Sequence, residues 1–246
     1  MGVIFLEKIT NWLIENSTVS ILSFFVGTFL SWIISNRGML KIGFDSLIHW
    51  NQEYRVSISY LFRIKIDNKY LLIKGNRIDQ YQPIGGVYKY YESFKENLNK
   101  WGVRDESEES FFEKNDLRIY VKGKNLCKVI KWFETMKNRE FSVNREFVEE
   151  LIRTDILSDD ALHNAKFEFV RRQNSGVHVS QHFKCREVLI YDIIDVELSK
   201  EDVDILIEKC KTNASVILAD FEFIDRECVT IEGKSYKIGA HAKYIK

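Results

Sequence analysis

The chain has 246 residues and no net charge, because 36 lysines and arginines balance 36 aspartates and glutamates. With 45% hydrophobic and 29% charged residues, its composition is that of a folded globular protein and excludes a disordered chain. The charge balance argues against the broad basic surface of proteins that bind long nucleic acids, so we expect no DNA or RNA polymer as a partner. The four cysteines lack CxxC spacing, which indicates neither a zinc knuckle nor a thioredoxin-type couple.

The first 36 residues predict a membrane anchor. Residues 1–16 mix apolar and charged side chains in the manner of a short amphipathic helix lying in a membrane interface. The following segment, 17–36, contains no charged residue. A helix of that length, at about 1.5 Å per residue, spans a hydrocarbon core of about 30 Å. We therefore expect a transmembrane helix over 17–36; a buried core helix and a cleavable signal peptide are the alternatives.

Charges on either side of this span predict its orientation. Arg37 and Lys41 follow it, whereas Lys8 and the amino terminus precede it. By the positive-inside rule, we expect a single-pass protein of the cell inner membrane whose C-terminal domain is cytoplasmic. Residues 37–50 are expected to form a linker to that domain.

Small residues recur inside the span at intervals of four. Ser23, Gly27, Ser31 and Ser35 would form one ridge along the helix, and such ridges allow two helices to approach closely in lipid. The sequence thus predicts self-association in the membrane, with a chance occurrence of common residues as the alternative.

The remainder of the chain predicts an α/β domain. Residues 54–66 alternate apolar and polar side chains as a half-buried strand does, and Asp67-Asn68 predicts a tight turn into a partner strand at 69–74. Helices are expected near 125–136 and 142–153 and from Ser199 onward. Further strands are expected at 166–171, 178–183, 188–197, 215–225, 228–232 and 235–238, before a short C-terminal helix. The order of these elements predicts a mixed or antiparallel sheet flanked by helices.

The most informative segment is the helix expected at 142–153. Glu146, Glu149 and Glu150 lie at i, i+3 and i+4 and therefore share one helix face. Three adjacent carboxylates repel one another unless a cation offsets the repulsion, and Mg²⁺ prefers such oxygen ligands. The segment is consistent with a possible Mg²⁺ site or with a solvated acidic surface.

The spacing of these residues resembles a known motif in two halves. Five residues separate Gly86 from Glu92, and the helix reads Arg145-Glu-Phe-x-Glu-Glu150. Together they resemble the Nudix box, G-x5-E-x7-R-E-U-x-E-E-x-G-U, in which U is a bulky apolar residue. Here 52 residues separate the halves in place of seven, and Ile152 stands where the box has glycine. The resemblance implies a Nudix-like α/β/α sandwich over 51–246, with an insertion at about 93–141.

The split pattern is similar to the SMODS-associated Nudix domain of membrane-anchored effectors in CBASS anti-phage systems. This resemblance implies that the domain senses a cyclic oligonucleotide made by a CD-NTase partner. Binding would drive oligomerisation of the membrane helices, membrane disruption and abortive infection. Two alternatives remain: a membrane-anchored, Mg²⁺-dependent hydrolase of nucleoside-diphosphate-type substrates, in which Glu149 would be the catalytic residue, and a membrane scaffold that binds no nucleotide.

An anionic cyclic nucleotide needs cationic groups for its phosphates and flat side chains for its bases. After the first hairpin, Gln82-Pro-Ile-Gly-Gly86 predicts a turn, which we call the glycine turn, with Gly85 and Gly86 as its glycine pair. Residues of the required types lie on or near this hairpin and the glycine turn. The candidates are Arg55, Arg63, Lys74, Arg77, Tyr81, Gly85, Gly86 and Tyr88. The alternative is that the tyrosines pack against the sheet and the cations are solvated.

Overall fold

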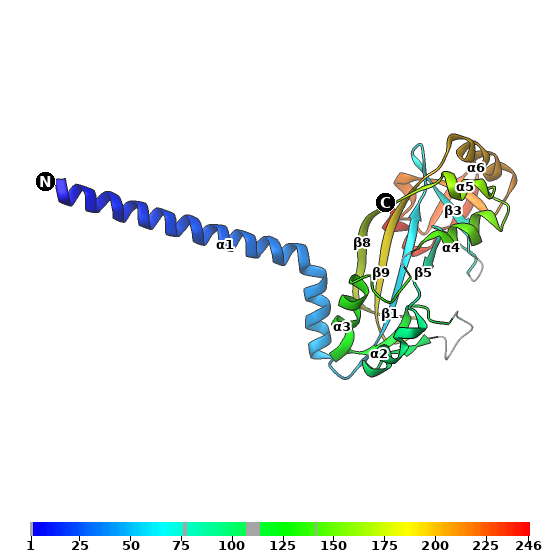
Figure 1. Cartoon of the computed structure of the whole chain (residues 1–246). Helices are drawn as coiled ribbons and strands as arrows, with labels where there is room; N and C mark the ends of the chain where they lie inside the picture. The colour runs from blue at the N-terminus through cyan, green and yellow to red at the C-terminus, as the bar shows by residue number, and fades with distance from the viewer. Residues whose placement is uncertain (1, 76–77, 107–113, 141) are drawn as a thin grey trace.

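The computed structural model describes residues 2–75, 78–106, 114–140 and 142–246, and it describes side chains from residue 23 onward. A single helix, α1 (Gly2–Ile48), forms the N-terminal part of the chain. In Figure 1 α1 is a long rod that projects from the domain, and the helix bends just before its C-terminal end meets the domain. Residues 2–16 of the interfacial helix predicted at 1–16 belong to this rod, but their side chains lie outside the described part of the structure.

The predicted transmembrane helix falls partly on these undescribed side chains. Over the residues that the structure describes, no helix combines the length and the apolar character needed to cross a membrane. The span at 17–36 therefore stays a prediction.

The C-terminal end of α1 is part of the domain. Residues 37–48, which we expected to be a linker, are helical because one side of this segment packs on helix α3 (Gly123–Glu134). Ile42 is fully buried there. Close packing requires Gly123, since a Cβ at that position would lie 2.6 Å from the His49 carbonyl oxygen and 2.8 Å from that of Ser46.

The centre of the domain is a mixed sheet built around β1 (Glu53–Arg63). In the described part of the chain, the strand order is β6-β7-β1-β9-β8, and β5 also pairs with β1. β1 runs parallel to β9 and antiparallel to β7 and β5. The bounds of the other strands are β5 (Gly85–Val87), β6 (Arg104–Asp105), β7 (Arg118–Lys122), β8 (Lys166–Val179) and β9 (Arg186–Glu197).

A second, smaller sheet continues from β1 after a break at Ile64. In it β3 pairs antiparallel with β10, β2 and β4, as expected for the hairpin that turns at Asp67-Asn68. A separate hairpin joins β11 to β12. The bounds are β2 (Lys65–Ile66), β3 (Lys69–Lys74), β4 (Tyr81–Gln82), β10 (Val216–Asp220), β11 (Cys228–Ile231) and β12 (Lys234–Lys237).

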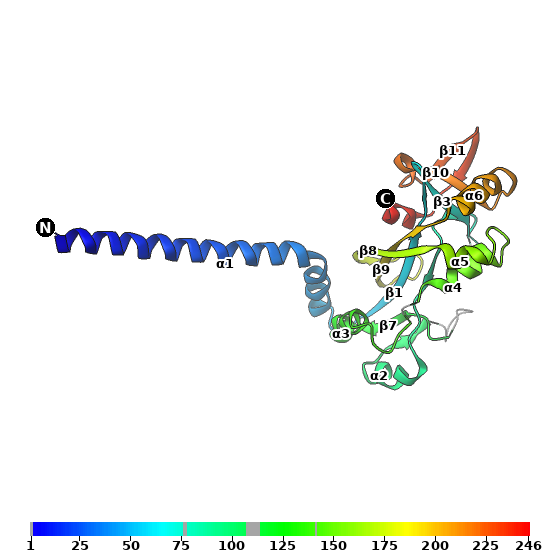
Figure 2. The same cartoon turned by 45° about the horizontal axis from the view of Figure 1, so that its top comes forward.

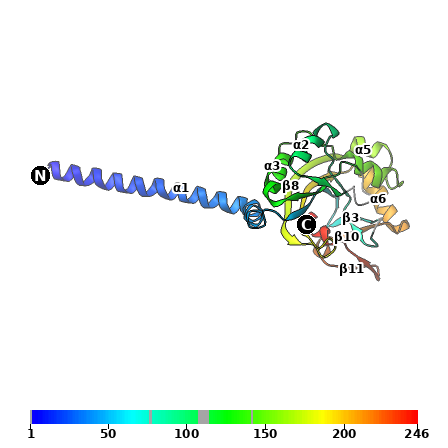
Figure 3. The same cartoon turned by 90° about the horizontal axis from the view of Figure 1, so that it is seen from below.

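Helices cover the edges and one face of these sheets (Figures 2 and 3). The helix expected from Ser199 onward is present as α6, and Ser199 caps it, since its Oγ accepts a hydrogen bond from the Asp202 backbone N–H at 3.1 Å. The remaining helical bounds are η1 (Glu92–Phe94), α2 (Lys95–Lys100), α4 (Asn144–Phe147), η3 (Val148–Ile152), α5 (Asp160–Asn164), α6 (Lys200–Thr212), η4 (Phe221–Phe223) and η5 (Ala240–Ile245).

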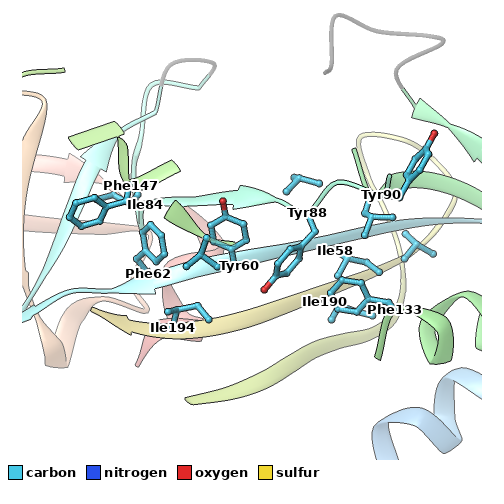
Figure 4. Packing of buried hydrophobic residues seen from close by; sticks show 14 of the residues in the cluster. Ile58, Tyr60, Phe62, Ile84, Tyr88, Tyr90, Phe133, Phe147, Ile190 and Ile194 are labelled. Carbon is cyan, nitrogen blue, oxygen red and sulfur yellow. The ribbon is translucent and has the colours of Figure 1, made fainter. Parts of the chain in front are cut away.

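The main core lies on one face of the central sheet. Figure 4 shows Ile58, Tyr60 and Phe62 of β1 in a row, packed against Phe133 of α3 and Phe147 of α4. The mixed α/β architecture, with sheets flanked by helices, is thus confirmed.

The opposite face of the sheet differs from a plain α/β/α sandwich. Leu61 and Ile193, on β1 and β9, are buried there in a second apolar cluster with Ala242 and Ile245 of η5. A short 3₁₀ helix and residues of the second sheet thus form this layer, because the chain after β10 is too rich in turns to form a long α-helix.

The predicted insertion at 93–141 is not a peripheral loop. It supplies β7, which pairs with β1 from Glu53↔Lys122 to Ser57↔Arg118, and it supplies α3 with its buried apolar side. This segment therefore completes the central sheet beside the predicted ligand region.

Candidate functional site

A cleft of about 430 Å³ separates the glycine turn before β5 from the α4–η3 helix. It brings the glycine of the first half of the split motif beside the helix of the second half, although 52 residues separate the two halves in the sequence. Glu92, the other residue of the first half, does not line the cleft. The lining residues are Gly75, Ile78, Gln82, Gly85, Gly86, Val87, Asp116, Arg118, Arg145, Glu146, Glu149 and Glu150.

The glycine pair allows the backbone to approach this closely. A Cβ on Gly86 would lie 2.2 Å from Glu146 Cγ, and one on Gly85 would lie 2.2 Å from the Tyr60 carbonyl oxygen. At Gly85 the clash is with the backbone of β1, so this close pairing requires glycine there; at Gly86 a side chain would displace the Glu146 side chain.

The opposite side of the helix anchors the glutamates. Phe147 and Leu151 are fully buried, and the Phe147 ring lies 5.4 Å from that of Phe167 and 6.3 Å from that of Phe62. Since these residues alternate with the glutamates around the helix, their burial leaves Glu146, Glu149 and Glu150 facing the cleft.

The helix is wider than an α-helix after Phe147. The Arg153 backbone N–H bonds to the Val148 carbonyl at 2.8 Å, an i to i+5 bond of a π-helical turn. Such turns are rare and are frequently found at functional sites. The motif has glycine at the position of Ile152, where its helix ends. Here the helix also ends at Ile152, and the residue with a left-handed backbone is Asp155, with a φ of 57°.

Arg145 holds the acidic side of the cleft together. Its Nη1 donates to Glu146 Oε1 at 2.6 Å and lies 3.7 Å from Glu149 Oε2, while Nη2 donates to the Val87 carbonyl at 3.1 Å. Its Nε lies 3.7 Å from Glu140 Oε1. One guanidinium therefore links the helix to β5.

Burial of the carboxylates changes their acidity. Burial, and to a smaller extent Glu149 and Glu150, raises the pKa of Glu146 from 4.5 to about 7 against the opposing effect of Arg145. Burial and the neighbouring Glu149 also raise the pKa of Glu150. Near neutral pH the cleft can thus take up a proton at Glu146.

The three glutamates have the chemistry of a Mg²⁺ site, but their present placement does not form one. Among the residues that the structure describes, no three histidine, cysteine, aspartate or glutamate side chains are placed to share a metal ion. Arg145 bonds to Glu146, and Glu149 lies between Arg145 and Arg153, at 3.7 and 3.9 Å. A divalent cation would have to displace these guanidinium contacts.

Of the predicted ligand residues that the structure describes, only Gly85 and Gly86 line this cleft. Arg77 lies outside the described residues. Lys74 is exposed and pairs with Asp79 at 2.9 Å, while Arg63 pairs with Asp195. Neither of these two cations lines the cleft.

The other three candidates are buried within the domain. Arg55 forms ion pairs with Glu106 at 2.9 Å and Glu187 at 2.5 Å, and its guanidinium lies 4.0 Å from the centre of the Phe183 ring. Tyr81 donates its hydroxyl hydrogen bond to the Ala214 carbonyl. The Tyr88 hydroxyl donates to Asp192 Oδ2 at 3.0 Å. Both tyrosines are thus buried in the domain, as in the alternative in which they pack against the sheet.

The sequence interpretation missed Asp116 and Arg118, which form an ion pair at 3.0 Å on the cleft wall. Arg118 is the first residue of β7 and precedes the apolar run Ile119–Val121, and Asp116 lies two residues before it. This short run is typical of a strand. Because the sequence interpretation assigned the whole segment to an insertion, it did not predict that these two residues lie beside the motif.

A mixed α/β domain with a glycine turn facing a glutamate-bearing helix across a cleft defines a Nudix-type domain. The family model of the SMODS-associated NUDIX domain matches residues 53–246. The chain therefore belongs to the SMODS-associated NUDIX domain family. No match to it was found among the curated proteins or the solved structures.

Proposed function

We propose that the protein is a membrane-anchored CBASS effector whose Nudix domain senses a cyclic oligonucleotide. The cleft at the glycine turn binds the messenger, and α1 carries the signal to the membrane. There the helices associate and disrupt the bilayer, which ends in abortive infection. Family membership and the arrangement of α1 on the domain support this proposal.

The observation that carries the proposal is that β1 connects α1 directly to the cleft. At one end of β1, the Tyr54 hydroxyl donates to Asp45 of α1 at 2.6 Å. Arg186, beside Tyr54 on β9, also bonds to Asp45, at 3.0 and 3.1 Å. Towards its other end, β1 pairs Tyr60 with Gly86 in the cleft wall. A displacement of the wall by ligand would thus be transmitted along a rigid strand to α1.

The charges of the cleft restrict how a nucleotide can bind. Arg118 and Arg145 supply guanidinium groups, which suit phosphate oxygens, but four carboxylates surround them. A phosphate approaching Arg145 would compete with Glu146 for Nη1. Protonation of Glu146 removes part of this competition, because a neutral carboxyl group holds the guanidinium less strongly and does not repel phosphate.

Calorimetry of the full-length chain in lipid nanodiscs against a panel of cyclic di- and trinucleotides tests the proposal. We expect one messenger to bind, and Arg118→Gln to weaken its binding at least tenfold. Arg63→Gln is the matched control, since it removes a paired arginine outside the cleft. In liposomes, the same messenger should increase the oligomer size measured by cross-linking.

Failure of every cyclic nucleotide to bind would contradict the sensor and favour the membrane scaffold. Binding without any change in oligomer size would contradict the proposed route to membrane disruption. Equal loss of binding in Arg118→Gln and Arg63→Gln would contradict the assignment of the cleft.

The second candidate function is a Mg²⁺-dependent hydrolase of nucleoside-diphosphate-type substrates. The observation that favours it is that Glu146, Glu149 and Glu150 all face one cleft. The test is formation of a nucleoside monophosphate from nucleoside diphosphate derivatives in the presence of Mg²⁺, since hydrolysis of the diphosphate bond leaves one phosphate on each product. This alternative expects turnover that Glu149→Gln abolishes; toxicity without turnover by the wild-type protein would exclude it.

A further inference from the structure

The part of α1 that packs on the domain has an exposed side that is apolar. Five residues form what we call the α1 apolar face: Leu40 is 40% exposed, Phe44 68%, Leu47 64%, Ile48 61% and Trp50 50%. Within the helix, the first four recur at spacings of three and four and so share one side. An exposed patch of large apolar side chains of this kind marks an interaction surface.

Cations border this face. Arg37 and Lys41 are exposed on the same side of the helix. On α3, exposed Lys124 lines a groove of about 460 Å³ with Phe44 and Leu47 of α1 and with Trp50, which follows the end of the helix. A helix with an apolar face bordered by lysine and arginine is the pattern of a segment that lies in the surface of an anionic membrane.

The bend in α1 orients this segment. In Figure 1 the end of α1 runs crosswise to the rod, and in Figure 3, where the rod is again seen from the side, the same end is viewed along its axis. If the rod crosses a bilayer, the crosswise segment lies along the bilayer surface. The domain covers the side with Ile42 and Ser46, which leaves the apolar face free to enter the lipid.

We propose that the α1 apolar face docks on the anionic lipid surface beside the predicted span, with Phe44, Leu47 and Trp50 inserted among the headgroups. This inference rests on the proposed membrane anchor. Docking fixes the angle between the domain and the membrane. A movement of β1 on ligand binding therefore also moves the end of α1 relative to the lipid.

A second copy of the chain is a less suitable occupant than lipid. Arg37, Lys41 and Lys124 would face the same cations across a two-fold interface, and like charges there are unfavourable. The face also begins within four residues of the predicted end of the span. At about 1.5 Å per residue, this distance keeps Leu40 within about 6 Å of the bilayer edge, even without the bend.

Tryptophan quenching by brominated lipid tests the proposal in the full-length chain. The protein is reconstituted in phosphatidylcholine vesicles with phosphatidylglycerol, with bromine on the upper acyl chain as the quencher. Difference spectra between wild type and Trp32→Phe, Trp50→Phe or Trp101→Phe report each tryptophan separately. Trp32 lies in the predicted span; Trp101 packs in the domain against Phe94, with ring centres 5.6 Å apart.

We expect the Trp50 signal to fall by at least half and the Trp101 signal to stay constant. Phe44→Ser with Leu47→Ser should reduce the quenching of Trp50 at least twofold, whereas Ile205→Ser, which removes an exposed apolar residue of α6, should not. Omitting phosphatidylglycerol should also reduce it, because the bordering cations then lose their partner.

The result separates docking from anchoring. Quenching of Trp32 without quenching of Trp50 would overturn the docking proposal and leave the anchor intact. Quenching of neither would overturn both. In a third outcome, the fluorescence of Trp50 is blue-shifted but not quenched, and the shift disappears when the protein is diluted in lipid. This outcome would show that a second copy of the chain covers the face, and it would overturn docking on lipid.

Discussion

Replacing Glu146 by glutamine removes the carboxyl group whose pKa burial in the cleft raises from 4.5 to about 7. Between these two pH values the folded protein holds a proton that the unfolded chain releases. The free energy of unfolding of the wild-type domain therefore falls as pH rises through this window. Above pH 7 the full penalty of a buried, charged carboxylate is present, and below pH 4.5 it is absent.

The magnitude follows from the width of the window. Each pH unit changes the free energy of unfolding by about 1.4 kcal/mol, so the penalty reaches ~3 kcal/mol by pH 8. The Glu146 side chain is only 13% exposed, so solvent screens little of it. Glu146→Gln lacks this pH dependence. Its free energy of unfolding, relative to wild type, should rise by ~3 kcal/mol between pH 4.5 and pH 8.

Urea unfolding of the full-length chain in detergent, followed by tryptophan fluorescence at pH 4.5, 6 and 8, measures this change. Glu197→Gln is the control, since it removes one carboxylate that is 72% exposed at the end of β9. Parallel pH profiles for wild type and Glu146→Gln would refute the reasoning, because the cleft would then not oppose ionisation of Glu146.

Three further changes test other parts of the structure. Arg55→Met leaves the buried Glu106 and Glu187 without their cation and should lower the free energy of unfolding by about 3–5 kcal/mol. In the same urea assay, the control Arg63→Met should lower it by at most about 1 kcal/mol, because the pair with Asp195 is partly exposed. Ile42→Ala should lower the free energy of unfolding by about 2–5 kcal/mol and expose the end of α1 to proteolysis. The control Leu40→Ala should change the free energy of unfolding by less than about 0.5 kcal/mol. Equal protease sensitivity of the two variants would contradict the packing of α1 on α3. Gly86→Ala displaces the Glu146 side chain from Arg145, which removes its competition with phosphate, and should tighten messenger binding by at least about twofold in calorimetry. Gly43→Ala, whose Cβ would meet Cys127 Sγ at an ordinary 3.7 Å, should bind as wild type does.

Local sequence patterns predicted the elements that neighbouring residues decide. The alternation that begins at Tyr54 forms β1, and Ser199 caps α6 because its hydroxyl reaches a backbone N–H only three residues away. The strands expected at 166–171 and 178–183 are instead one strand, β8, which ends at Val179. Pairing with β9 keeps the residues between them extended, with register shifts near Phe169 and Asn174, and such long-range pairing is invisible in a local pattern.

The candidate site was predictable where a motif specifies it. The three glutamates and the glycine pair of the motif line one cleft, although 52 residues separate the two halves of the motif. For single arginines and tyrosines, residue type and proximity in the sequence were not enough. Arg55 lies on the predicted strand, but its carboxylate partners are 51 and 132 residues away, and they hold it outside the cleft.

By itself, the sequence determined the family, the strand and helix periodicities and the acidic face of one helix, because each of these depends on residues within a few positions of one another. Only the tertiary structure decided that Arg145 bridges that face to β5, that the supposed insertion supplies Asp116 and Arg118 to the cleft wall, and that the end of α1 packs on α3. These features depend on contacts between distant segments, where burial and ion pairing select one partner among many of the same residue type.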